Sequence, residues 1–120
     1  MERKDRFRRM AIITESACWE GSGDEDGKTV FNLVMVYIAG EASGKELDKR
    51  YVFKENPPEY LCRDLLRMGY VVQTVDQLKD IAGQLVGAVV RVSLAQDGDT
   101  FRVYIDDYFG RDDPSKYTNG

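Results

Sequence analysis

The sequence contains no histidine and only two cysteines, Cys18 and Cys62. Histidine is the commonest general base and a frequent zinc ligand, so its absence removes the usual residue for both kinds of site. The two cysteines lack CxxC spacing and have no histidine to activate them, so we interpret them as reduced thiols of an intracellular protein. These absences predict a protein that is not an enzyme and that needs no cofactor and no metal.

Long apolar runs are also missing. No stretch of about 18 apolar residues occurs, so we expect no membrane-spanning segment. Basic residues at the start are followed by no apolar stretch, so we expect no signal peptide and a cytoplasmic location. A chain of 120 residues is the length of one ordinary domain.

Acidic residues outnumber basic ones outside the first ten residues. The chain has a formal net charge of −4, and its first ten residues hold five basic and two acidic side chains. This balance is not the strongly basic footprint of a duplex-DNA-binding protein. We predict a flexible basic arm over residues 1–9, a domain over residues 10–110 and a flexible polar tail over residues 111–120.

The clearest local pattern is a β-hairpin in the last third of the chain. Residues 86–95 and 101–106 alternate apolar and polar or small side chains with a period of two, which is typical of half-buried strands. The intervening segment contains Asp97-Gly98, a strong signal for a tight turn. A hairpin cannot bury its apolar face alone, so the remaining chain is expected to cover it.

The other elements follow from similar patterns. Asn56 and Pro57 resemble a helix start, and leucines at helical spacing predict a helix over residues 57–68. Thr74 followed by Gln77 resembles a capping box that opens a short second helix. Three further strands are expected at residues 10–19, 29–38 and 47–54.

This order of elements predicts a mainly β protein. Five strands with a helical insert between strands three and four are the element order of an OB-fold-like barrel, and an open α+β sheet with the same order is the alternative. Tyr51 and Phe53 are expected to pack inside. The rest of the expected core is Leu61, Leu65, Val86, Val90, Val92, Phe101, Val103 and Ile105.

Several segments together resemble a known group of proteins. They are the polar loop after the first strand, Tyr37-Ile38, the turn at residues 40–45, residues 52–56, and residues 78–87 leading into an alternating strand. In their order and spacing they are similar to small phage proteins of replication and recombination regions, whose members look like single-stranded-DNA-binding OB-folds. The resemblance spans roughly residues 11–109. It implies an accessory role on single-stranded DNA in the bacterial host cytoplasm.

Binding a single strand requires aromatic faces for the bases and cations for the phosphates. In an OB-fold the faces of strands two and three and two neighbouring loops supply them. Little sequence preference is expected, and the choice between DNA and RNA stays open. The candidate residues are Trp19, Phe31, Tyr37, Arg50, Lys54, Arg91, Arg102 and Tyr104.

Two acidic segments favour an alternative function. Residues 15–28 hold five acidic side chains and residues 96–113 hold six. Such charges repel phosphates and suit a basic protein surface. The alternative is therefore an acidic protein-binding module, such as a phage inhibitor of a host nucleic-acid enzyme or defence protein. Replication or recombination proteins are further candidate partners, and homodimerisation stays open.

Overall fold

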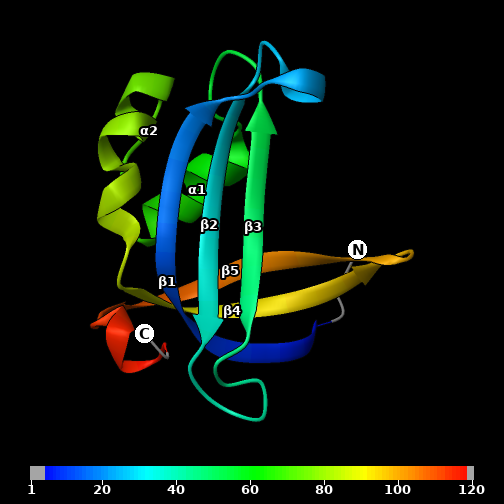
Figure 1. The fold of residues 1–120 in the computed structure, drawn as a ribbon, viewed down its shortest axis with the longest axis vertical. Helices are drawn as coiled ribbons and strands as arrows, with labels where there is room; N and C mark the ends of the chain where they lie inside the picture. The colour runs from blue at the N-terminus through cyan, green and yellow to red at the C-terminus, as the bar shows by residue number, and fades with distance from the viewer. Residues whose placement is uncertain (1–4, 119–120) are drawn as a thin grey trace.

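The computed structural model describes residues 5–118. Five strands, two α-helices and three short 3-10 helices follow one another along the chain (Figure 1). They are β1 (Asp5–Glu20), η1 (Gly23–Glu25), β2 (Thr29–Tyr37), β3 (Glu46–Phe53), α1 (Glu59–Arg67), α2 (Val75–Ile81), η2 (Ala82–Leu85), β4 (Ala88–Asp97), β5 (Thr100–Arg111) and η3 (Pro114–Lys116).

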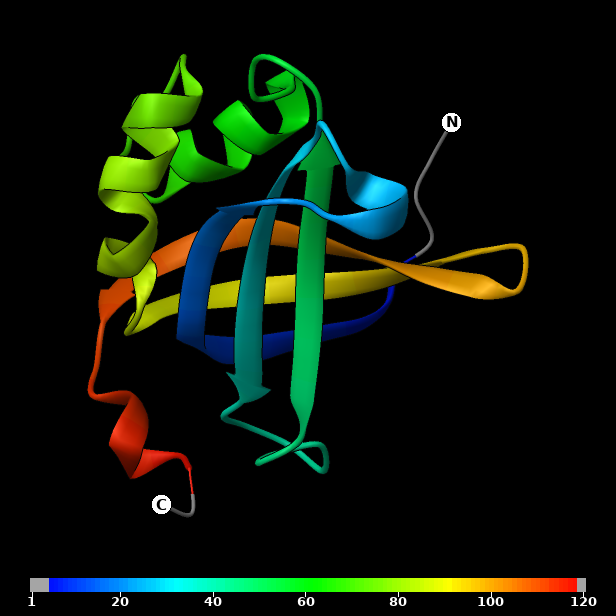
Figure 2. The same cartoon turned by 45° about the horizontal axis from the view of Figure 1, so that its top comes forward.

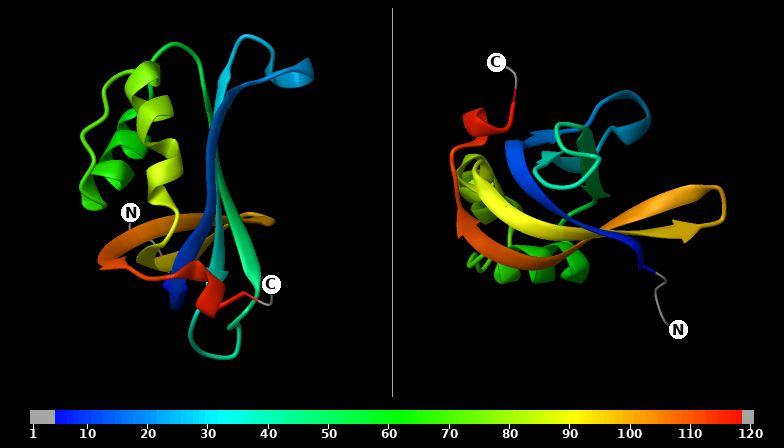
Figure 3. Two further views of the ribbon diagram at one scale, coloured as in Figure 1. Left: turned by 60° about the vertical axis from the view of Figure 1, so that its left-hand side comes forward. Right: turned by 90° about the horizontal axis from the view of Figure 1, so that it is seen from below.

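The five strands form one antiparallel sheet in the order β3-β2-β1-β4-β5. The first part of β1, from Asp5 to Ile12, pairs with β4, and the part from Ala11 to Glu20 pairs with β2. A bulge between Ile13 and Glu15 interrupts the pairing with β2, and bulges of this kind bend a strand. As a result β4 and β5 cross the upright strands β1, β2 and β3 (Figures 1 and 3).

The closed barrel expected from the sequence is not completed by backbone pairing. Within residues 5–118, β3 and β5 are the two edges of the open sheet. Side chains cover part of the β5 edge instead. The Lys49 ammonium on β3 donates to the Val103 carbonyl at 2.5 Å, and the Arg67 guanidinium on α1 donates to the Ile105 carbonyl at 2.7 Å. Charged side chains placed this way protect a sheet edge from pairing with other chains.

One apolar core lies between the sheet and the helices. It includes Phe31 of β2, Tyr51 of β3, Leu61 of α1 and Ile105 of β5, all at most 2% exposed. Burial of such side chains contributes roughly 1.5–3 kcal/mol each. The buried members of the core cluster are Ala11, Ile13, Phe31, Leu33, Met35, Tyr37, Tyr51, Phe53, Leu61, Leu65, Met68, Val72, Leu78, Ala82, Leu85, Ala88, Val90, Val92 and Ile105.

Most of the expected core is confirmed, including Tyr51 and Phe53. Val103 is partly buried against the core. The predictions for Val86 and Phe101 are wrong, because these side chains are 37% and 54% exposed. Val86 precedes β4 at the turn through Gly87. Phe101 is the second residue of β5, next to the β4–β5 turn, and this end of the hairpin extends away from the helices (Figure 2).

The two helices lie between β3 and β4 in the chain and cover one side of the sheet (Figure 3). The capping box of α2 is confirmed: Thr74 Oγ1 accepts from the Gln77 N–H at 3.2 Å, and Gln77 Oε1 accepts from the Thr74 N–H at 3.1 Å. The expected cap of α1 is wrong, since Pro58 holds the cap position and α1 begins at Glu59. None of the described helices has the length and apolar character needed to cross a membrane.

Both expected chain ends differ from the structure. Residues 5–9 of the predicted arm belong to β1, held by the backbone ladder with β4, and residues 1–4 lie outside the described residues. Most of the predicted tail folds back. The Asp112 N–H donates to the Gly87 carbonyl at 2.9 Å, and Asp112 Oδ2 accepts from the Tyr117 hydroxyl at 2.7 Å. Residues 119 and 120 lie outside the described residues.

Candidate nucleic-acid interface

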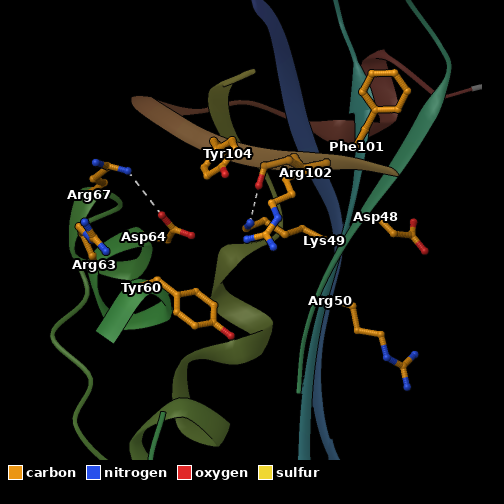
Figure 4. Close-up of a pocket in the computed structure, with 11 residues that line it drawn as sticks. Asp48, Lys49, Arg50, Tyr60, Arg63, Asp64, Arg67, Phe101, Arg102 and Tyr104 are labelled. Carbon is orange, nitrogen blue, oxygen red and sulfur yellow. Dashed lines mark hydrogen bonds and ion pairs between the residues drawn. The ribbon is translucent and has the colours of Figure 1, made fainter. Parts of the chain in front are cut away.

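A groove of about 680 Å³ lies between the two edge strands, beside α1. One wall comes from β3, another from β5 and the third from α1 (Figure 4). The groove is therefore located where the open sheet leaves a gap. Its lining residues are Asp48, Lys49, Arg50, Tyr60, Arg63, Asp64, Arg67, Phe101, Arg102, Val103 and Tyr104.

The β3 wall combines an inward and an outward face. Alternation along the strand places Lys49 on the same face as the buried Tyr51, with Asp48 and Arg50 on the other face. The Lys49 ammonium lies 5.0 Å from the ring centroid of Tyr51 and 5.8 Å from that of Tyr104. In Figure 4, Lys49 occupies the middle of the groove, while Arg50 extends away from the α1 side chains.

The α1 wall presents one polar face of the helix. Tyr60, Arg63, Asp64 and Arg67 follow a spacing of three and four residues, which places them on one side. Leu61 and Leu65 point into the core. The helix therefore presents cations to the groove while its apolar side anchors it to the sheet.

Asp64 fixes the position of this helix face. Its Oδ2 accepts a 2.6 Å hydrogen bond from the buried Tyr51 hydroxyl, and its Oδ1 lies 3.4 Å from the Arg67 guanidinium. Burial, followed by the neighbouring Asp64 carboxylate, raises the pKa of the Tyr51 phenol. Tyr51 consequently remains a neutral donor that links the floor of the groove to α1.

The β5 wall supplies aromatic surface. The Phe101 side chain is 54% exposed, and across the groove the Tyr60 side chain of α1 is 50% exposed. Exposed rings of this kind offer faces on which planar groups stack. Tyr104 is partly buried beside Lys49.

Positive charge predominates in the groove. Its lining includes five basic side chains, Lys49, Arg50, Arg63, Arg67 and Arg102, against Asp48 and Asp64, in a chain whose net charge is −4. Burial lowers the pKa of Lys49, and nearby Arg102 lowers it further against the opposing effect of Asp64. The other basic side chains repel the partly buried Lys49 ammonium, and an anionic ligand in the groove would offset this repulsion.

The structure brings together only part of the predicted site. Arg50, Arg102 and Tyr104 line the groove. Trp19 is 40% exposed and lies outside it, with the Arg50 guanidinium carbon 5.7 Å from its ring centroid. Lys54 is exposed just beyond the end of β3 and does not line the groove.

The remaining predicted residues lie elsewhere. Phe31 is fully buried and Tyr37 is 7% exposed, so neither ring offers an open face to a base, and the prediction that they stack bases is wrong. Both belong to the core because their side of β2 faces the helices. Arg91 forms an ion pair with Asp107 on the β4–β5 hairpin, away from the groove lining.

Among the basic and aromatic residues that line the groove, sequence reasoning missed five, and three of these come from α1. The missed residues are Lys49, Tyr60, Arg63, Arg67 and Phe101. The signal was present in α1 as a polar face at helical spacing opposite its leucines. No family model, curated protein or solved structure matches this chain.

Proposed function

We propose that this protein is an OB-type single-stranded nucleic-acid-binding protein whose strand lies in the groove between β3, α1 and β5. The observation that carries the proposal is the lining of that groove, which combines five basic side chains with exposed rings. Cations along a groove together with aromatic stacking faces are the chemistry of single-strand binding without sequence preference.

The fold supports this proposal. An OB-fold is a partly open five-stranded barrel, and this sheet has five antiparallel strands that remain open between β3 and β5. The cations occupy that opening, with Lys49 on one edge strand and Arg102 on the other. A flexible single strand fits between two such walls, and its unpaired bases are available to Tyr60 and Phe101. A duplex keeps its base faces stacked inside.

Binding rather than catalysis fits the same lining. The eleven lining residues include no serine, threonine, cysteine or histidine, so the groove lacks a Ser–His or Cys–His pair for nucleophilic catalysis. The resemblance to small phage proteins supports DNA as the strand and an accessory role in replication or recombination. Backbone phosphates would contact the arginines, and any base would stack, which predicts little sequence preference.

Fluorescence anisotropy of a labelled oligo-dT at about 50 mM salt tests the proposal. We expect Arg63→Ala to weaken binding and to reduce the slope of log K against log salt by about 0.7, the value for one lost phosphate contact. Tyr60→Ala should weaken binding by about tenfold, because stacking contributes roughly 1–3 kcal/mol per base. Lys79→Ala is the matched control, since Lys79 is exposed on α2 outside the groove.

The result that would refute the proposal is equally specific. If the unaltered protein shows no binding to oligo-dT at tens of micromolar, the groove is not a single-strand site. An acidic module that binds a basic protein then becomes the better hypothesis. If binding occurs but Lys79→Ala weakens it as much as Arg63→Ala, the strand lies on another surface.

A further inference from the structure

Trp19 lies outside the groove but close to Arg50, which lines it. It is the only tryptophan of the chain, it lies near the end of β1, and its side chain is 40% exposed. Its neighbour Cys18 packs against the core, so alternation places Trp19 on the opposite face of the sheet. A large exposed ring on a sheet face is well suited to stack a planar group.

Arg50 lies between Trp19 and the groove. The Arg50 guanidinium carbon is 5.7 Å from the Trp19 ring centroid, and the same residue lines the groove. Figure 4 shows the Arg50 side chain extending from β3 away from α1. In the cross-strand row of Arg50, Asn32 on β2 and Ala17 on β1 have shorter side chains than Arg50 and Trp19.

Glu25 holds Arg50 in this position. The carboxylate of Glu25 in η1 forms an ion pair with Arg50, whose side chain is 47% exposed. Figures 1 and 2 show η1 beside the end of β3. An ion pair this exposed contributes little to stability, so a phosphate can replace Glu25 as the partner of Arg50 at small cost.

We propose that a strand bound in the groove continues over the edge of β3, places a phosphate on Arg50 and stacks a base on Trp19. This inference rests on the proposed function and extends it, because it assigns a second stacking site and a longer footprint than the groove alone. When Arg50 turns to the phosphate, the Trp19 face that it covers becomes available to the base. Glu25 then acts as a competitor that restrains binding.

Oligonucleotide length separates the two parts of the site. We would titrate the full chain with labelled dT oligonucleotides of about 4 and about 12 nucleotides, within the range of OB-fold site sizes. Anisotropy reports binding, and the fluorescence of the single tryptophan reports stacking on Trp19. Both oligonucleotides should bind, and only the longer one should quench the tryptophan.

Variants of Trp19 and Glu25 test the role of each residue separately. Trp19→Ala should weaken binding of the longer oligonucleotide by about tenfold and change that of the shorter one by less than about twofold. Trp19→Phe, which keeps an aromatic face, should recover most of the loss. Glu25→Gln should strengthen binding of the longer oligonucleotide by about threefold, the size of an exposed ion pair.

The outcomes distinguish this inference from the proposed function. If both lengths bind, neither quenches the tryptophan and Trp19→Ala has no effect, the strand does not reach Trp19, and the inference is overturned while the groove stands. If neither length binds, both proposals fail. The quenching measurement uses the unaltered protein, so the test does not depend on the folding of Trp19→Ala.

Discussion

If the groove binds a single strand as proposed, replacing Lys49 by methionine should weaken that binding while changing the free energy of unfolding by at most about 2 kcal/mol. Methionine keeps an unbranched side chain of similar length and removes the charge at the middle of the groove. In the structure the Lys49 ammonium donates to the Val103 carbonyl at 2.5 Å and lies 5.0 Å from the Tyr51 ring centroid. The substitution therefore removes a link across the open edge and a cation together.

The Lys49→Met substitution has two opposing effects on the stability of the fold. Loss of a hydrogen bond from a charged donor costs roughly 1.5–3 kcal/mol. Burial lowers the pKa of Lys49, so the fold already penalises this charge, and methionine relieves a desolvation cost of several kcal/mol at full burial. The net change is then about 2 kcal/mol or less in either direction, which corresponds to less than about 8 °C in Tm for a chain of this size.

The Lys49→Met substitution should only weaken the proposed binding. Loss of one phosphate contact reduces the slope of log K against log salt by about 0.7. If the variant and the unaltered protein bind equally at 1 M salt, the variant then binds roughly tenfold more weakly at 50 mM salt. Anisotropy titrations between 50 and 500 mM salt measure the slope, and thermal melts measure Tm. Lys54→Met is the matched control, since Lys54 lies just past β3 and outside the groove. If Lys49→Met binds oligo-dT as the unaltered protein does and Lys54→Met binds more weakly, the groove is not the binding site, and the site expected from the sequence is favoured.

Three further predictions test the structure around the groove and the C-terminal turn. Tyr51→Phe removes the 2.6 Å hydrogen bond to the buried Asp64, and calorimetry should show Tm lower by about 6–12 °C; an unchanged Tm would contradict the role given to this bond. The Lys49 pKa is lowered mainly by burial, so affinity for oligo-dT should fall as the pH rises through that lowered pKa, at a pH where exposed lysines are still charged. Lys49→Arg should remove this dependence, and an identical profile would place the titrating group elsewhere. Hydrogen bonds from Tyr117 and Lys116 lower the pKa of Asp112 to about 2, so its stabilising effect is complete above the ordinary pKa and is lost as the pH falls from about 4 towards 2. Urea unfolding of Asp112→Asn should therefore depend less steeply on pH in this interval than that of the unaltered protein, and equal steepness would refute the assignment.

The hairpin was predictable from sequence because its two strands alternate over the core. Val90, Val92 and Ile105 are buried as expected. Phe101 has the same periodicity but lies where the hairpin extends beyond the core, and periodicity identifies the face of a strand without showing how far the core reaches. For β2, apolar residues occur on both faces, so alternation did not reveal that Phe31 points inward.

The groove was harder to predict because its walls are far apart in the sequence. Arg102 and Tyr104 were recognisable as polar positions on a strand, whereas Arg63 and Arg67 on α1 required knowledge of where the helix docks. That docking depends on Leu61 and Leu65 entering the core and on the bond between Tyr51 and Asp64. Closure of the barrel was also unpredictable, since it depends on whether two edge strands approach closely enough for backbone pairing.

The shared strand β1 has a consequence for how the molecule folds during synthesis. Its second half can pair with β2 as soon as the next segment of chain is synthesised. Its first half pairs with β4, which lies in the last third of the chain. Until β4 is made, residues 5–12 have an open backbone edge and the inner face of the β1–β2–β3 meander lacks part of its cover. Such long-range pairing slows folding and exposes nascent chains to aggregation. Truncation before β4 should therefore leave a nascent chain that engages chaperones, while release of the complete hairpin allows both halves of β1 to pair.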